Sequence, residues 1–130
     1  MKRLISVLLV LLLLCGCTRI TPEATLTVTV EAVHENGRGL IPPTAVPLPE
    51  GATVLDALTI AAKECDVSVV LAGDTPYRYV AAIDDVVVDG SLSRWLCYVN
   101  GQLSQIGIEQ EKINDGDTCR FLFVTDFTKN

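Results

Sequence analysis

One amphipathic helix, flanked on both sides by strand-like runs, most constrains what this 130-residue chain can fold into. Residues 53–66 place their apolar side chains on one stripe at the helical repeat of about 100° per residue. Thr53 can cap the first turn, and Asp56 three residues later can complete a variant of the capping box. About 13 helical residues extend about 20 Å, enough to cross a small sheet. The stripe comprises Val54, Leu55, Ala57, Leu58, Ala61, Ala62 and Cys65.

Two strands are predicted before this helix. Residues 24–33 alternate apolar and polar side chains with a period of two, as a half-buried strand does. Residues 40–49 contain four prolines, which confine a strand to the edge of a sheet. We therefore expect a short edge strand over 44–48, paired with the first strand.

Several strands are predicted after the helix, within residues 67–71, 78–88 and 93–99. Asn100-Gly101 is a strong signal for a two-residue hairpin turn. Residues 118–124 are apolar on both faces apart from Arg120, which predicts a central strand. One helix on a mixed sheet of about four to six strands is an α+β fold. If the last strand lies beside the first, the plan is that of a β-grasp domain.

The first residues predict where the protein is located in the cell. Lys2-Arg3 and the apolar run 4–14 form a secretory signal pattern, too short to span a bilayer, which takes about 20 helical residues. Residues 14–17, LCGC, resemble the bacterial lipobox. That resemblance implies cleavage after Gly16, so that residues 1–16 are a signal peptide, and a diacylated Cys17 as membrane anchor. Two acyl chains suffice for stable anchoring. Residues 17–23 would form a tether outside the cytoplasm, and residues 24–130 the domain; an ordinary secreted protein and a membrane-spanning anchor are the alternatives.

The charge of the chain argues against some partners. The formal charge of −6 becomes −8 without the signal segment, because Lys2 and Arg3 leave with it and no acidic residue precedes Cys17. An acidic surface disfavours nucleic acid and electrostatic binding to anionic lipids. The expected membrane contact is therefore the N-terminal lipid.

Three cysteines remain beyond Cys17, so at most one internal disulfide can form. Cys97 and Cys119 could pair if their strands are neighbours, and three buried free thiols including Cys65 are equally compatible with the sequence. We expect no metal site, because the chain has no C-x-x-C pair and His34 is its one histidine. We expect His34 to be exposed to solvent.

The segment EGATVLDAL (50–58) resembles the turn-to-helix entry of many β-grasp domains. Two further segments resemble the transcobalamin-like C-terminal domain family. They are YVAAIDDV (79–86) and SRWLCYVNG (93–101) followed by the NDGD turn at 114–117, and the likeness covers about residues 24–127. Asp85 stands where the family usually has glycine. In bacteria such domains occur on surface proteins and lipoproteins, and in the animal cobalamin-binding proteins the domain covers one face of the corrin. The resemblance implies a β-grasp fold and a corrinoid ligand, not a resident cofactor.

The candidate ligand-binding residues are the aromatic side chains and the hairpin: Trp95, Tyr98, Asn100, Gly101, Tyr77 and Tyr79. Apolar aromatic area beside free backbone donors suits a flat ligand rimmed with amides. The alternative is that Trp95 belongs to the core and Asn100-Gly101 is simply a turn. Trp95 and Tyr98 fall on opposite faces of their strand, because side chains alternate along it.

We expect no catalytic residues. The serines lack a nucleophile-elbow motif, and the cysteines lie in apolar runs where thiolate is disfavoured. The predicted function is therefore a lipid-anchored, extracytoplasmic domain that binds a small ligand such as cobalamin or a related corrinoid. The alternative is an envelope module that binds a protein or glycan. Partial exposure of Trp95 and Tyr98 at a concavity favours the first; burial of both favours the second.

Overall fold

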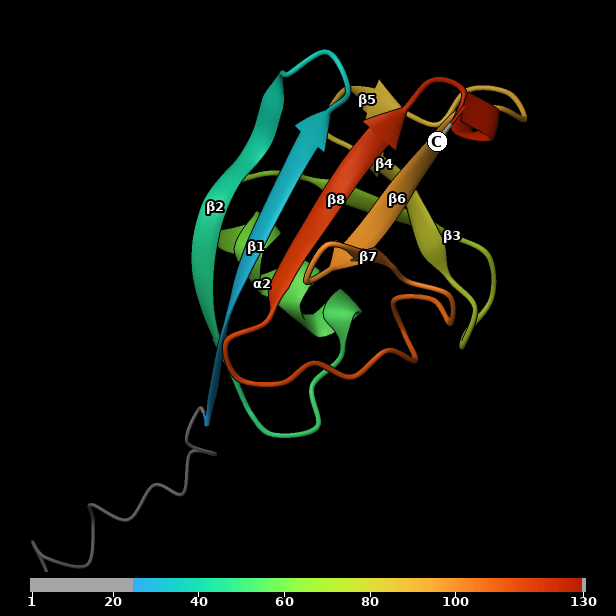
Figure 1. Cartoon of the computed structure of the whole chain (residues 1–130). Coiled ribbons are helices and arrows are strands. Elements are labelled where there is room, and N and C mark those ends of the chain that lie inside the picture. The colour runs from blue at the N-terminus through green and yellow to red at the C-terminus, as the bar shows by residue number, and fades with distance from the viewer. Residues whose placement is uncertain (1–24, 130) are drawn as a thin grey trace, which may run out of the picture.

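Two β-sheets and one long α-helix build the described part of the chain, residues 25–129 of the computed structural model (Figure 1). The fold is therefore α+β, as predicted. The predicted signal peptide, lipidated Cys17 and tether lie outside the described residues. The elements are β1 Leu26–His34, β2 Gly39–Leu48, α2 Val54–Glu64, β3 Val69–Ala72, β4 Tyr79–Ile83, β5 Val86–Val87, β6 Arg94–Val99, β7 Gln102–Leu103, β8 Thr118–Val124 and the 3-10 turn η2 Phe127–Lys129.

The larger sheet has five strands in the order β2-β1-β8-β6-β7. β1 and β8 are parallel, and the other neighbours are antiparallel, so the sheet is mixed. The last strand is central and lies beside the first, which confirms the prediction made from its apolar pattern. β2 is longer than expected: it includes Pro42 and Pro43, which an edge strand tolerates because one side of it needs no ladder hydrogen bonds.

The helix forms where the sequence predicts it and ends two residues earlier. Its capping box is complete: the Asp56 N–H donates to Thr53 Oγ1 at 3.3 Å, and the Thr53 N–H donates to Asp56 Oδ2 at 2.9 Å. The apolar stripe of α2 shares one hydrophobic core with the inward residues of β1, β2 and β8. Val30, Leu58 and Phe121 are among its fully buried side chains.

The strands β3, β4 and β5 form a separate small sheet, which the sequence analysis did not separate from the main one. A two-residue turn at Asp84-Asp85 joins β4 to β5, and Asp84 has a positive φ of 48°. The Asp84 carboxylate accepts the Ser68 N–H at 2.9 Å, which fixes the turn against the start of β3. Turn chemistry thus explains Asp84, while the Asp85 carboxylate accepts two hydrogen bonds from the Arg38 guanidinium at 2.7 and 3.0 Å.

The cysteines of the described residues are free thiols. Cys97 and Cys119 do lie on neighbouring strands, but Cys97 is opposite Phe121 while Cys119 is opposite Val99. The two are therefore two residues out of register, and the disulfide considered from the sequence is absent. Burial raises the pKa of the Cys119 thiol to about 11, and it raises the pKa of Cys97 further.

Within residues 25–129, no helix has both the length and the apolar character that a membrane span requires. The described strands and helix close their hydrophobic core among themselves. This core lies within residues 25–129.

Candidate functional site

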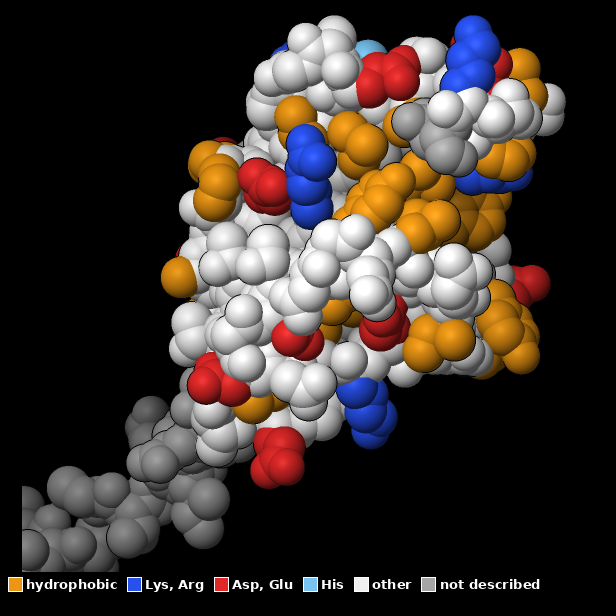
Figure 2. Space-filling view, viewed as in Figure 1, with side chains coloured by type: hydrophobic (Ala, Val, Ile, Leu, Met, Phe, Trp, Pro, Cys, Tyr) orange, Lys and Arg blue, Asp and Glu red, His pale blue; other side chains and the backbone are white. Residues whose placement is uncertain are grey.

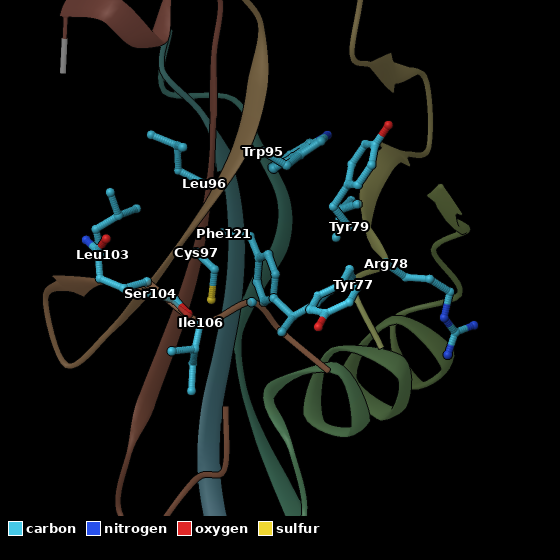
Figure 3. Close-up of a pocket in the computed structure, with 14 residues that line it drawn as sticks. Tyr77, Arg78, Tyr79, Trp95, Leu96, Cys97, Leu103, Ser104, Ile106 and Phe121 are labelled. Atoms are coloured by element: carbon cyan, nitrogen blue, oxygen red, sulfur yellow. The ribbon is translucent and has the colours of Figure 1, made fainter. Parts of the chain in front are cut away.

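An apolar cavity of about 400 Å³ opens between the small sheet and the end of the large one (Figure 3). β4 forms one wall, and β6 with the segment 103–108 forms the other. Apolar side chains also gather densely over the β6 end of the sheet in Figure 2. The principal lining residues are Tyr77, Tyr79, Trp95, Leu103, Ile106 and Phe121.

The floor of the cavity is made by buried residues of the main sheet. Phe121 from β8 and Cys97 from β6 are directly opposite each other in the strand pairing, so their side chains share one face. Ile108 closes the floor from the loop side and is also buried. The floor is thus built from the same residues as the core, and its shape is fixed by the fold.

Trp95 is half-buried at the side of the cavity. Its indole Nε1 donates to the Val86 carbonyl at 3.1 Å, and its ring lies 5.3 Å from the Phe123 ring, centroid to centroid. The hydrogen bond and the aromatic contact together fix the orientation of the indole. What remains available to a ligand is its apolar surface.

The mouth of the cavity carries unusually exposed apolar side chains. Tyr77 is 74% exposed and Ile106 is 56% exposed, and Tyr79 and Leu103 are also exposed. In Figure 3 the two tyrosines lie on one side of the opening, and Leu103 and Ile106 lie on the other. Exposed apolar side chains around a concavity mark a binding site more often than a core.

An ion pair holds the two walls together. The Arg78 guanidinium contacts the Glu109 carboxylate, and the Arg78 backbone N–H donates to the same carboxylate oxygen at 3.2 Å. Arg78 lies between the two tyrosines in sequence, and Glu109 follows the loop that forms the opposite wall. The pair therefore joins the segment that carries the tyrosines to the loop wall.

The cavity contains one polar group without a partner. The Ser104 Oγ is buried and has no hydrogen-bond partner in the structure, while the Ser104 N–H donates to the Cys97 carbonyl at 2.8 Å. The Cys97 thiol beside it is neutral, because burial raises its pKa. These groups can orient a ligand, and the raised pKa disfavours nucleophilic thiolate chemistry.

The structure brings together three of the six predicted ligand-binding residues, namely Tyr77, Tyr79 and Trp95. Tyr98 and Gly101 border a different hollow of about 370 Å³ with Arg120, on the other face of the sheet. The alternation of side chains along β6 forbids Trp95 and Tyr98 from sharing one site, so the six residues do not form the single site that the sequence analysis grouped.

Asn100 has a structural role. Its side-chain amide donates to Asp117 Oδ1 at 2.8 Å, and its carbonyl oxygen accepts the Thr118 N–H at 2.9 Å. Asn100 and Gly101 both have positive φ, 51° and 81°, as a type I′ turn requires. The alternative interpretation of this dipeptide as a turn is therefore correct, and its side chain braces β6 against the start of β8.

Sequence reasoning missed the loop wall. Residues 102–110 carry no regular period, so the sequence predicts neither a strand nor a helix there. The available signal was the apolar triplet Leu103, Ile106 and Ile108 within a polar, glycine-containing stretch. Of the three, Ile108 is buried and the other two are exposed.

A second hollow of about 600 Å³ adjoins the first and is mainly polar. The two share Leu103, Gln105 and Ile106 as a common border. The second hollow is also lined by Asn100, Glu111, Lys112, Asn114 and Asp117.

Residues 25–129 contain no group of three or more His, Cys, Asp or Glu side chains placed to hold a metal ion. His34 is half-buried, not fully exposed as expected: its Nδ1 accepts the Asn36 N–H at 3.0 Å, and its ring packs 5.1 Å from that of Phe123. Asp115 and Asp117 accept backbone N–H groups from Thr27 and Asn114. These acidic side chains therefore stabilise turns.

Comparison with known proteins identifies a family and a fold. A family model described as a domain of unknown function, DUF4430, matches residues 51–125. The crystal structure of haptocorrin in complex with Cbi is similar at a TM-score of 0.69 and 12% identity, over 84% of this chain and 27% of that chain. The chain thus spans about a quarter of the length of haptocorrin.

A second similar structure is described as a "putative metal binding protein" from Ruminococcus gnavus. It has a TM-score of 0.55 and 14% identity, over 76% of this chain and 96% of that chain. No curated protein sequence matches the chain. At these identities the likeness to both structures is one of fold.

Proposed function

The chain belongs to the DUF4430 family of domains of unknown function, and from this premise we propose that it binds a small, largely apolar ligand in the cavity between β4 and β6. Its resemblance to the transcobalamin-like C-terminal domains holds in both comparisons, with the family and with haptocorrin. The family assignment names no ligand, so the proposal rests on the site itself.

The observation that carries the proposal is the half-open aromatic cavity. Ligand sites are concave and mostly apolar, with volumes of about 300–1,000 Å³ and a few polar groups that orient the ligand. The cavity beside Trp95 has about 400 Å³, a rigid apolar floor and one unpartnered hydroxyl, that of Ser104. Trp95 is half-buried at its side, the arrangement that favours ligand binding over a purely structural role.

We propose a corrinoid as the first ligand to test. The resemblance to the cobalamin-binding domains supports it, and so does the haptocorrin structure, which is a complex with Cbi. The cavity lies near the small end of the range for ligand sites. We therefore expect a corrin ring to lie across its mouth, against Tyr77, Tyr79 and Ile106, with one edge inside. A chain that spans about a quarter of haptocorrin offers one face of a clamp, so we expect weak binding unless a second protein covers the other face.

The test is a calorimetric titration of cobinamide and cobalamin into residues 24–130. We expect binding that is lost in Trp95→Ala and kept in Tyr98→Ala, a matched aromatic control on the opposite face of β6. Circular dichroism shows that each variant is folded. No heat with either corrinoid at high micromolar concentration ends the corrinoid version of the proposal.

We propose that the domain is carried outside the cytoplasm by a lipid on Cys17. The LCGC motif and the preceding apolar run support this. Cells that express the full chain and are fed an alkyne analogue of palmitate should label the wild type and leave Cys17→Ala unlabelled. Equal labelling of both, or recovery of the wild type in the soluble fraction, would contradict the anchor.

We also propose that the fold follows the β-grasp plan and that the domain binds without catalysis. A single helix lies across a mixed sheet whose first and last strands are parallel neighbours, which supports the plan. An experimental structure with another strand order would refute it. If the domain binds without catalysis, a ligand recovered after prolonged incubation with it should have an unchanged mass.

A second candidate function is an interaction module for an envelope protein. The exposure of Tyr77, Tyr79 and Ile106 around one opening also suits a protein surface. Cross-linking in cells from a photoreactive residue at Tyr77 discriminates between the two. A single protein adduct that persists in the presence of saturating small ligand would favour the interaction module.

A further inference from the structure

The apolar cavity and the polar hollow adjoin each other along a border formed by Leu103, Gln105 and Ile106, and together they are named the trough. A ligand seated against Trp95 that crosses this border reaches the second hollow. One part of the trough is aromatic, and the other is lined by acids, amides and Lys112. The ligand that fills both is therefore amphipathic.

Two polar side chains of the second hollow, those of Asn100 and Asp117, already have partners. Asp117 accepts from the Asn100 amide with one carboxylate oxygen and from the Asn114 N–H with the other. The side-chain amide of Asn100 is used for the same contact and for Thr118. This network braces two turns and leaves little of its hydrogen-bonding capacity for a ligand.

Among the remaining polar side chains of this hollow, which include Lys112, Glu111 is the one with a buried atom that lacks a partner. Its Oε2 is buried and has no hydrogen-bond partner in the structure, and its carboxylate forms none of the ion pairs among residues 25–129. A buried polar atom without a partner is destabilising, and more so when it is charged. The buried polar side-chain atoms without partners in the described residues are Glu111 Oε2 and Ser104 Oγ, and both belong to the walls of this trough.

A bound donor would satisfy both atoms. A carboxylate accepts hydrogen bonds and donates none, so the complementary group at Glu111 is an N–H or ammonium donor. The Ser104 hydroxyl, deeper in the apolar part, can donate or accept. An anionic ligand end would be repelled by the buried carboxylate of Glu111, and the opposing attraction of Lys112 comes from an exposed side chain of the same hollow, which water screens.

We propose that the natural ligand has a flat apolar body that lies against Trp95 and a nitrogen-bearing end, an ammonium or a primary amide, that donates to Glu111. This inference deepens the proposed function and rests on the cavity being the binding site. It assigns Glu111 as the residue that determines which end groups are accepted.

The test uses three probes that share a body and differ in their end: 4-phenylbutylammonium, 4-phenylbutanol and 4-phenylbutanoate. Trp95 is the one tryptophan of the chain, so its fluorescence reports binding at the cavity directly. We expect the ammonium probe to bind residues 24–130 at least tenfold more tightly than the carboxylate probe, with the alcohol between them. Glu111→Gln should reduce the ammonium preference to less than threefold and leave the affinity for the alcohol unchanged.

Glu64→Gln is the matched control, because it removes the same charge from an exposed position at the end of α2, outside both hollows. It should keep the full preference. If the alcohol binds but the three probes do not differ, or if Glu64→Gln acts like Glu111→Gln, this inference is overturned and the proposed cavity stands. If no probe changes the Trp95 emission, both the cavity and this inference fail.

Discussion

At the scale of single residues, neighbours in sequence have different tasks because a strand alternates its side chains. Trp95 lines the cavity and Cys97 forms its floor, whereas Tyr98, the next residue, lies on the other face of the sheet. The sequence shows which residue types are present at β6. Whether an aromatic side chain can touch the ligand depends on the face of the sheet to which its position in the strand points.

The structural role of Asn100 gives a prediction at this scale. Asn100→Ala removes two side-chain hydrogen bonds. It also places alanine, whose side chain cannot form a local hydrogen bond, at a positive φ of 51°. We expect a loss of about 1–2 kcal/mol in the free energy of unfolding, measured by urea denaturation. The affinity for a probe confined to the apolar cavity, such as 4-phenylbutanol, should not change, because Asn100 lines the second hollow and not this cavity. A loss of affinity with unchanged stability would restore Asn100 as a binding residue.

At the scale of elements, the helix is held by its own ends as well as by its apolar stripe. Thr53 makes both halves of the capping box with Asp56, and the residue is half-buried beside the loop that carries Glu111. The backbone connects the two: the Val54 N–H donates to the Glu111 carbonyl at 2.9 Å. The start of α2 therefore also supports the floor of the polar hollow.

Replacing the cap tests this support. Thr53→Ala should lower the free energy of unfolding by about 1 kcal/mol, because the Asp56 N–H loses its acceptor. Thr53→Ser keeps the hydroxyl and should remain within a few tenths of a kcal/mol of the wild type. Urea denaturation followed by circular dichroism measures both. Equal destabilisation by the two variants would assign the effect to the methyl group, not to the cap.

At the scale of the whole molecule, the sequence predicts the helix, the central last strand and the α+β class because each follows from a local period or a cap. It fails where the answer depends on how separate segments meet. Leu103 and Ile106 follow no helical or strand period, and they become a cavity wall only because their loop lies opposite the segment of Tyr77 and Tyr79 in the folded chain. Likewise, only the assembled sheet determines that the residue opposite Cys97 is Phe121 and not Cys119.

The two buried thiols predict how stability depends on pH. Burial raises the pKa of Cys119 from 9.0 to about 11 and raises that of Cys97 further, while in the unfolded chain both return to ordinary values. Above pH 9 the unfolded state therefore loses protons that the folded state keeps, so stability is full below pH 9 and falls as pH rises toward 11. Urea midpoints at pH 8 and pH 10.5 measure the fall. The Cys97→Ala, Cys119→Ala double variant should be less stable at pH 8 because of its smaller core side chains. Its midpoint should nevertheless fall less between the two pH values than that of the wild type, and an equal fall would show that the thiols are not protected.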